Sequence, residues 1–331
     1  MRSKGTTLFI AISLFFANCL GGGLFSSSEA SSSVCPAVGR VLSKGDSKFP
    51  AGRLICIGES IQLARLPAVR VLCFVSGRVK QFTTGQIVSQ TEGCNAPPRQ
   101  TQQLRRCGAQ EIYLCVRPKG PDDQTLSLRL IYPYGRVVST TTPALRWHPE
   151  PQAHHYTVQV EGKGVNWQQN VTAPALPYPK NFPPLQQGQA YKITIAAYNQ
   201  QNTLLGVKQS VLNVLSQSTA QAIHDKVEQV KGLDLGEDEV TVLDLTSIYL
   251  VHGLLQDAIG VLQTRADAGS RNPLLYRVLA DCYLTVGRSD LAKPQYEKAI
   301  ALANAVSDQD VLVSAQAGLK QLSTCLLYTS D

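Results

Sequence analysis

The chain has 331 residues, of which 44% are apolar and 17% are charged, and its net charge is +7. This composition is that of a globular protein, and it excludes both a disordered chain and a multi-span membrane protein. The length predicts about two or three domains with separate cores rather than one compact fold. The basic residues are scattered along the chain, so nucleic acid is not an expected partner.

The N-terminus has the features of an export signal. Two basic residues precede an apolar run, 8–17, that is too short to span a bilayer. Residues 1–30 are therefore predicted to be a signal peptide that is cleaved after Ala30. An uncleaved leader, or a lipid anchor at Cys19, is the alternative, and only these would tie the protein to a membrane. In every case we expect an exported protein of the periplasm or cell envelope.

Residues 31–120 are predicted to form a basic, disulfide-containing β domain. Short β-type runs alternate with Gly, Pro and polar clusters. An even number of cysteines in an exported domain is typical of disulfides, whose pairing the sequence leaves open. No Cys-x-x-Cys and no His occur in this region, so no metal site is expected. The candidate disulfide cysteines are Cys35, Cys56, Cys73, Cys94, Cys107 and Cys115.

Three segments of this region carry a family resemblance: 38–41, 52–61 and 69–77. In order, these segments contain a Gly-x-Val strand, a strand that ends at a glycine followed by an acidic residue, and a hydrophobic strand followed by a turn. In this order they resemble the FecR-type periplasmic β domain. Gly58-Glu59 replaces the Gly-Asp that the family favours. The resemblance implies an all-β domain, and the family's signalling role is not carried over.

Residues 121–215 show the alternation of apolar and polar residues that half-buried antiparallel strands require. Pro143–Pro149, Tyr156–Val160 and Leu185–Asn199 carry this pattern. They resemble a fibronectin type III domain, which implies a β-sandwich of the immunoglobulin kind with Trp147 and Tyr191 in its core. The alternative for the tryptophans is an exposed aromatic platform for sugars.

Residues 216–323 contain a tandem repeat. Apolar, glycine and small residues recur at an interval of about 34 residues. The pattern resembles the tetratricopeptide repeat, which implies an all-α array of helix pairs with a turn at each repeated glycine. The repeat positions are Leu245, Tyr249, Gly253, Ala258, Leu262, Tyr276, Leu279, Tyr283, Gly287, Ala292, Tyr296 and Ala299.

The same resemblance implies a groove for a protein or peptide ligand, lined by the first helix of each unit. Arg277 would pair with a carboxylate of the partner, and Asp281 would accept from a backbone N–H. Packing of the leucines against the next repeat is the alternative. The groove positions are Val240, Leu243, Ser247, Leu250, Leu274, Arg277, Asp281 and Leu284.

The remaining segments carry no recognisable chemistry. No nucleophile elbow, phosphate loop, His-Glu-x-x-His or complete dinucleotide fingerprint occurs, so neither an enzyme nor a cofactor is expected. His154 and His155 are interpreted as turn residues beside a strand. Residues 324–331 fit no repeat and are predicted to be a non-native, adapter-derived tail, which leaves the number of repeats open.

The sequence thus predicts a multidomain protein with an all-β N-terminal domain, a β-sandwich and an all-α helical array. Its expected function is that of a non-catalytic scaffold or adaptor of the cell envelope that binds a protein through its repeats. The alternative is a cell-wall or polysaccharide-binding protein that uses the basic β domain, for example on an anionic wall polymer. The partner's identity and the oligomeric state are left open.

Overall fold

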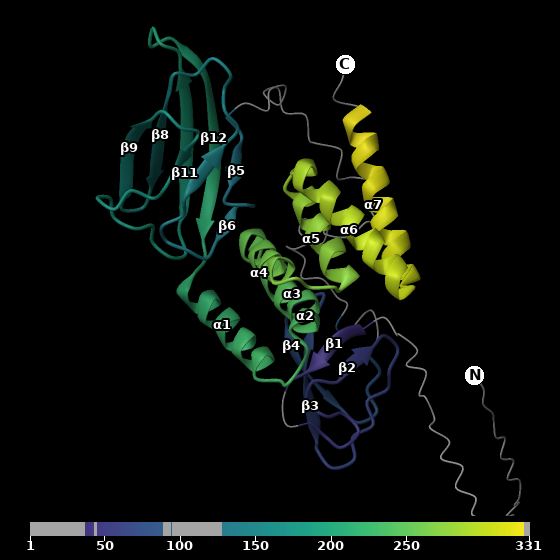
Figure 1. The fold of residues 1–331 in the computed structure, drawn as a ribbon. Helices are drawn as coiled ribbons and strands as arrows, with labels where there is room; N and C mark the ends of the chain where they lie inside the picture. Colours follow the sequence, from purple (N-terminus) through teal and green to yellow (C-terminus); the bar gives the residue numbers. More distant parts are fainter. Residues whose placement is uncertain (1–36, 43–44, 89–93, 95–127, 328–331) are drawn as a thin grey trace, which may run out of the picture. The chain divides into compact units, whose positions relative to one another are not determined.

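The computed structural model describes residues 37–42, 45–88, 94 and 128–327, and the side chains up to residue 322. Pro36–Asp331 form one compact unit. In the described part of the chain, strands precede helices (Figure 1). The predicted signal peptide lies outside the described residues.

The first sheet is antiparallel and has the strand order β2-β1-β3-β4. Its short strands are rich in β-branched residues, whose alternate side chains fill a small core with Phe49, Ile55 and Phe82. The strands are β1 (Ala37–Val41), β2 (Leu54–Cys56), β3 (Ala68–Cys73) and β4 (Val79–Thr83).

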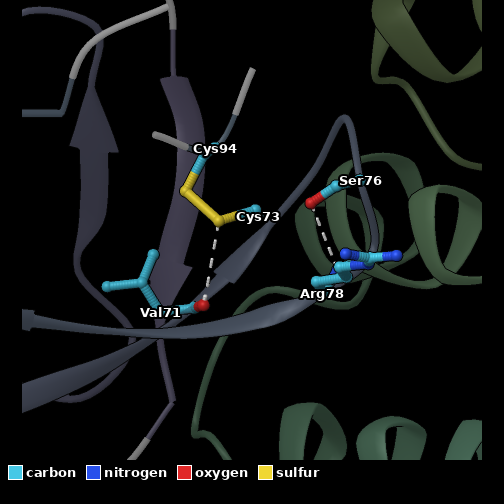
Figure 2. Close-up of a disulfide and its surroundings, with 5 residues drawn as sticks. All are labelled: Val71, Cys73, Ser76, Arg78 and Cys94. Carbon is cyan, nitrogen blue, oxygen red and sulfur yellow. Dashed lines mark hydrogen bonds between the residues drawn. A yellow bond between two sulfur atoms is a disulfide. The ribbon is translucent and has the colours of Figure 1, made fainter. Parts of the chain in front are cut away.

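A disulfide joins Cys73, the last residue of β3, to Cys94 (Figure 2). Both sulfur-bearing side chains are fully buried in the core of the first sheet. Cys56, on β2, is disulfide-bonded as well. The other three candidate cysteines, Cys35, Cys107 and Cys115, lie outside the described residues. A disulfide is consistent with an oxidising, exported location.

Two further sheets enclose the largest hydrophobic core of the described residues. One has the order β10-β7-β5, and the other has the order β6-β12-β11-β8-β9. Trp147 and Trp167 are 1% and 5% exposed, so neither forms a surface platform for sugars. The strands are β5 (Leu130–Tyr132), β6 (Val137–Val138), β7 (Leu145–Trp147), β8 (His155–Gly162), β9 (Val165–Val171), β10 (Ala175–Leu176), β11 (Ala190–Tyr198) and β12 (Leu204–Val214).

Helices follow the last strand. Ser216 caps the first of them by accepting from the backbone N–H of Thr219, and Asn272 caps α5 in the same way. The helices are α1 (Gln217–Lys231), α2 (Glu237–Glu239), the π-helix η2 (Val240–Leu245), α3 (Thr246–Leu250), α4 (Leu255–Asp267), α5 (Pro273–Thr285), α6 (Ser289–Val306) and α7 (Gln309–Leu327). Pro294 lies inside α6, beyond the N–H groups at the helix start that lack partners, so it removes the helical bond to the Asp290 carbonyl.

The first sheet and the helices share a hydrophobic cluster. Leu72 of β3 and Leu42, which follows β1, are buried in one cluster with Ile223 and Val227 of α1 and Ile248 of α3. A small sheet with a short core leaves apolar side chains on its second face, and these are covered here by helices. The part of the chain that is rich in strands and the part that is helical are therefore joined by packing.

The fold class that we expected from the sequence is wrong. In the β-rich part, β6 pairs in parallel with β12, so the five-stranded sheet is mixed and is not the purely antiparallel sheet that we expected. The helical part is not a regular tetratricopeptide array, because a π-helix occupies 240–245, in the first predicted unit. The residue boundaries proposed for the domains stay predictions.

Candidate partner-binding surface

The predicted groove residues lie on η2, α3 and α5. Leu243 is on η2, Leu250 on α3, and Leu274 and Leu284 on α5. All four leucines pack against one hydrophobic cluster but remain partly exposed. We call Leu243, Leu250, Leu274, Leu284 and Arg277 the helical face.

Three predicted groove residues do not belong to this face, and the first two are Val240 and Ser247. Val240 is 7% exposed and packs in the cluster shared with the first sheet. The hydroxyl of Ser247, on α3, donates to the carbonyl of Leu243, on η2, so its hydrogen bond is made within the protein.

Asp281 and Arg277 form an internal hydrogen-bonded group. Arg277 Nη1 lies 2.5 Å from Asp281 Oδ2, and the Tyr296 hydroxyl of α6 donates to Asp281 Oδ1 at 2.5 Å. Burial raises the pKa of Asp281 to about 6, although Arg277 and Tyr296 act in the opposite direction. Since Asp281 is 2% exposed and already accepts both bonds, it does not face a ligand. Arg277 keeps 17% of its side chain exposed at the edge of the helical face.

Residues from the β-rich part border this face, and the sequence did not suggest them. The ring of Tyr134 lies 6.1 Å from that of Tyr283 in an edge-to-face arrangement. Arg129 Nη2 donates to the carbonyl of Val286 at 3.1 Å, and its guanidinium lies against Gly287. These contacts hold the C-terminal end of α5 against the β-rich part of the chain.

The predicted repeat positions are mostly buried between α3, α4, α5 and α6. Gly253 and Gly287 lie in turns and both have a φ of 74°, a left-handed conformation that favours glycine. Tyr249 is partly exposed and Gly287 is exposed. The buried members are Leu245, Gly253, Ala258, Leu262, Tyr276, Leu279, Tyr283, Ala292, Tyr296 and Ala299.

The π-helix next to this face holds a buried ion pair. Arg40, on β1, is fully buried, and its Nε lies 2.9 Å from both carboxylate oxygens of Asp244. Its Nη1 donates to the Gly52 carbonyl and its Nη2 to Glu239, each at 2.8 Å. Each nitrogen of the guanidinium thus has an acceptor. We call Arg40, Asp244 and Glu239 the arginine clasp.

Burial also favours the neutral form of Asp244, the buried carboxyl of the clasp. It raises the pKa of Asp244 to about 6, against the opposing effect of Arg40. The π-helix adds one residue per turn, and Thr246 stabilises it by donating its hydroxyl to the Thr241 carbonyl at 2.7 Å. No local sequence signal indicates this pair, because its members are 204 residues apart.

The described residues contain no cluster of three or more side chains suited to a metal ion. His154 is exposed, and the ring of His155 stacks on that of Tyr198 at 5.1 Å. Within the described ranges, no helix is both long enough and apolar enough to cross a membrane.

Comparisons with known proteins assign no family. No protein-family model matches the sequence, and no curated protein is similar to it. A structure of astrotactin-2, described as a conserved vertebrate-specific and perforin-like membrane protein, is 14% identical over 56% of this chain, with a TM-score of 0.20. A β-1,2-glucanase from Parabacteroides distasonis is 8% identical over 54%, with a TM-score of 0.23. The aligned parts span 36% and 24% of these two chains, and likenesses this weak carry no functional argument.

Proposed function

We propose that the chain is a non-catalytic, exported adaptor of the periplasm or cell envelope that binds a protein partner through its helical face. The observation that carries this proposal is the partial exposure of four leucines on η2, α3 and α5, with Arg277 at their edge. Leucines that are half covered by their own core lose little conformational entropy on binding, and an arginine beside them supplies charge-assisted hydrogen bonds.

The neighbouring contacts support a rigid platform. Asp281 and Tyr296 tie α5 to α6, and Arg129 ties the end of α5 to the β-rich part. A surface that is ordered before binding requires less reorganisation in the complex. No catalytic group is required for this role.

The test compares two double variants of the full chain. Leu274→Ala with Leu284→Ala changes the helical face, and Val306→Ala with Val313→Ala changes two exposed valines outside it. The partner would be captured from an envelope extract, identified by mass spectrometry and then purified. Its dissociation constant for each variant would be measured by calorimetry. Thermal unfolding would check that both variants keep their fold.

We expect the leucine variant to bind the purified partner about tenfold more weakly or worse, and the valine variant to bind like the wild type. Equal affinity of both variants would move the site away from the helical face. Retention on wall polymer without any specific protein would contradict the adaptor role.

The second candidate is binding of an anionic wall polymer by the basic β region. It is favoured by the exposed side chains of Arg65, Arg70 and Arg78 near the first sheet. Such binding would weaken steeply with added salt, which co-sedimentation at low and high ionic strength would measure.

A further inference from the structure

The five-stranded sheet has one face that packs in the core and one face that no described helix or sheet covers. On β8 and β11, the residues Tyr156, Val158, Ile193 and Ile195 point into the core. Because successive side chains of a strand point to opposite sides, their neighbours lie on the other side of the sheet. We call the side that carries these neighbours, on β9, β8, β11 and β12, the outer sheet face.

The strand registers place four uncharged polar residues in one row across this face. Gln168 of β9 pairs with Gln159 of β8, Gln159 pairs with Thr194 of β11, and Thr194 pairs with Gln209 of β12. Neighbouring strands are about 4.8 Å apart, so the row is a regular ladder of amide and hydroxyl groups. We call these four residues the central row.

The rows on either side of the central row are already engaged. The Thr157 hydroxyl donates to Asn170 Oδ1 at 2.9 Å on one side, and Lys192 Nζ lies 2.7 Å from Glu161 on the other. The side chains of the central row make no hydrogen bond to any other described residue. The row therefore offers donors and acceptors to a ligand.

Apolar side chains flank the central row at β12. Val207 and Val211, two positions before and after Gln209, are 49% and 44% exposed. Leu204, at the start of the same strand, is 51% exposed. The outer sheet face thus combines a polar row with an uncovered apolar strip.

We propose that the outer sheet face binds a neutral, hydroxyl-rich glycan. A glutamine side chain both donates and accepts, as does a threonine hydroxyl, and sugar hydroxyls need both kinds of partner. Val207 and Val211 would contact the C–H faces of the sugar rings, whose burial is favourable. The occupant is a neutral polymer because Lys192 and Glu161 neutralise one another and the central row carries no charge, although the whole chain has a net charge of +7.

The sheet is rigid enough for such a ligand. β11 pairs with β8 without interruption from Tyr191 to Tyr198, and with β12 without a bulge from Ala190 to Ala197. The central row thus lies on regular strands, which position side chains more precisely than loops do. This face uses no residue of the helical face, so the glycan proposal stands independently of the adaptor role.

The test is affinity electrophoresis of the full chain through gels that contain one soluble polysaccharide each. The neutral probes are hydroxyethylcellulose, laminarin, dextran and glucomannan, and the anionic probe is polygalacturonate. The test variant is Gln159→Ala with Gln209→Ala. The matched control, Gln186→Ala with Gln187→Ala, changes two exposed glutamines that precede β11.

We expect at least one neutral polysaccharide to retard the wild type and the control equally, at low and at high salt. The association constant of the test variant should be lower by about tenfold or more, because it loses hydrogen bonds from two side chains. Thermal unfolding of both variants should match the wild type.

Three outcomes would overturn the proposal: no retardation by any neutral probe, retardation by polygalacturonate alone that salt abolishes, or equal retardation of the test variant and the control. The second would indicate the basic region of the chain instead. The third would place the glycan elsewhere.

Discussion

Asp281 is a buried carboxyl whose proton is held more tightly in the folded state. Burial raises its pKa to about 6, while Arg277 and the Tyr296 hydroxyl oppose the rise. A carboxyl whose pKa is raised on folding contributes stability that is complete below its unfolded pKa of about 4. That contribution is lost as the pH rises through about 6.

Replacing Asp281 with Asn should flatten the pH dependence of stability. Between pH 4 and 7, we expect the wild type to lose on the order of 1–3 kcal/mol more free energy of unfolding than the variant. Urea unfolding followed by tryptophan fluorescence at several pH values would measure this difference. Some slope should remain, because burial also raises the pKa of Asp244 to about 6.

The control for this prediction is Asp310→Asn, which changes an exposed carboxyl of α7. It should keep the wild-type profile. A profile of Asp281→Asn that parallels the wild type would show that another group titrates in this range.

At this scale, the tetratricopeptide resemblance placed four leucines in a groove, and these leucines are partly exposed in the structure, while their role in binding stays a prediction. The sequence could not show that the Asp281 carboxylate accepts hydrogen bonds from Arg277 and Tyr296 and is therefore not available to a ligand. The difference depends on Tyr296, fifteen residues away on another helix, whose hydroxyl reaches the carboxylate only when α5 and α6 are packed. A hydrogen bond between two helices depends on how the helices pack. The sequence shows that Asp281 and Tyr296 are present, but it does not show that they meet.

The π-helix η2 is a local irregularity that the Thr246 side chain stabilises. Its hydroxyl donates to the Thr241 carbonyl, five residues earlier, inside the buried part of the helix. Thr264 makes a comparable bond to the Gly260 carbonyl, four residues earlier, on the exposed side of α4. The two threonines form a matched pair that differs in burial.

Thr246→Val should lower the free energy of unfolding by about 1 kcal/mol, because a buried carbonyl loses a donor. Thr264→Val should stay within about 0.5 kcal/mol of the wild type, since water replaces its hydroxyl. Chemical denaturation of both variants would measure the difference. Equal effects would mean that η2 does not depend on this bond.

Elements with a clear period could be predicted from the sequence, and irregular ones could not. The alternation in 156–160 and 185–199 corresponds to β8 and β11, and glycines stand at the turns after α3 and α5. The parallel pairing of β6 with β12 has no such signal, because β6 is only two residues long. The π-helix η2 has no sequence signal either, because its wider turn barely changes the spacing of the apolar residues.

At the scale of the whole molecule, the arginine clasp joins the first sheet to the helices. Both Arg40 and Asp244 have fully buried side chains. Glu239 is 45% exposed and contributes little, as solvent screens it. Removing one member of a buried pair leaves the other uncompensated.

We expect Arg40→Met to lower the free energy of unfolding by about 3–5 kcal/mol. The double variant Arg40→Met with Asp244→Leu should recover most of this loss, because it removes both buried charges together. A double-mutant cycle by urea denaturation would provide the coupling energy. Additive effects would show that the two residues act independently.

The Cys73–Cys94 disulfide closes a loop with a sequence separation of 21. Replacing both cysteines with Ala should cost about 3 kcal/mol, since the unfolded chain gains the corresponding entropy. Calorimetric unfolding of the variant and the wild type, both under oxidising conditions, would measure it. A loss below about 1 kcal/mol would contradict this expectation.

The shared cluster and the arginine clasp both join segments that are synthesised far apart in time. The ribosome makes Arg40 and Leu42 long before α1 and α3, which cover them in the finished protein. Contacts between such distant segments form late and slow down folding. The first sheet is therefore made before the carboxylate that pairs with its arginine and before the helices that cover its apolar side, so that a segment made early depends on one made about 200 residues later to reach its final state.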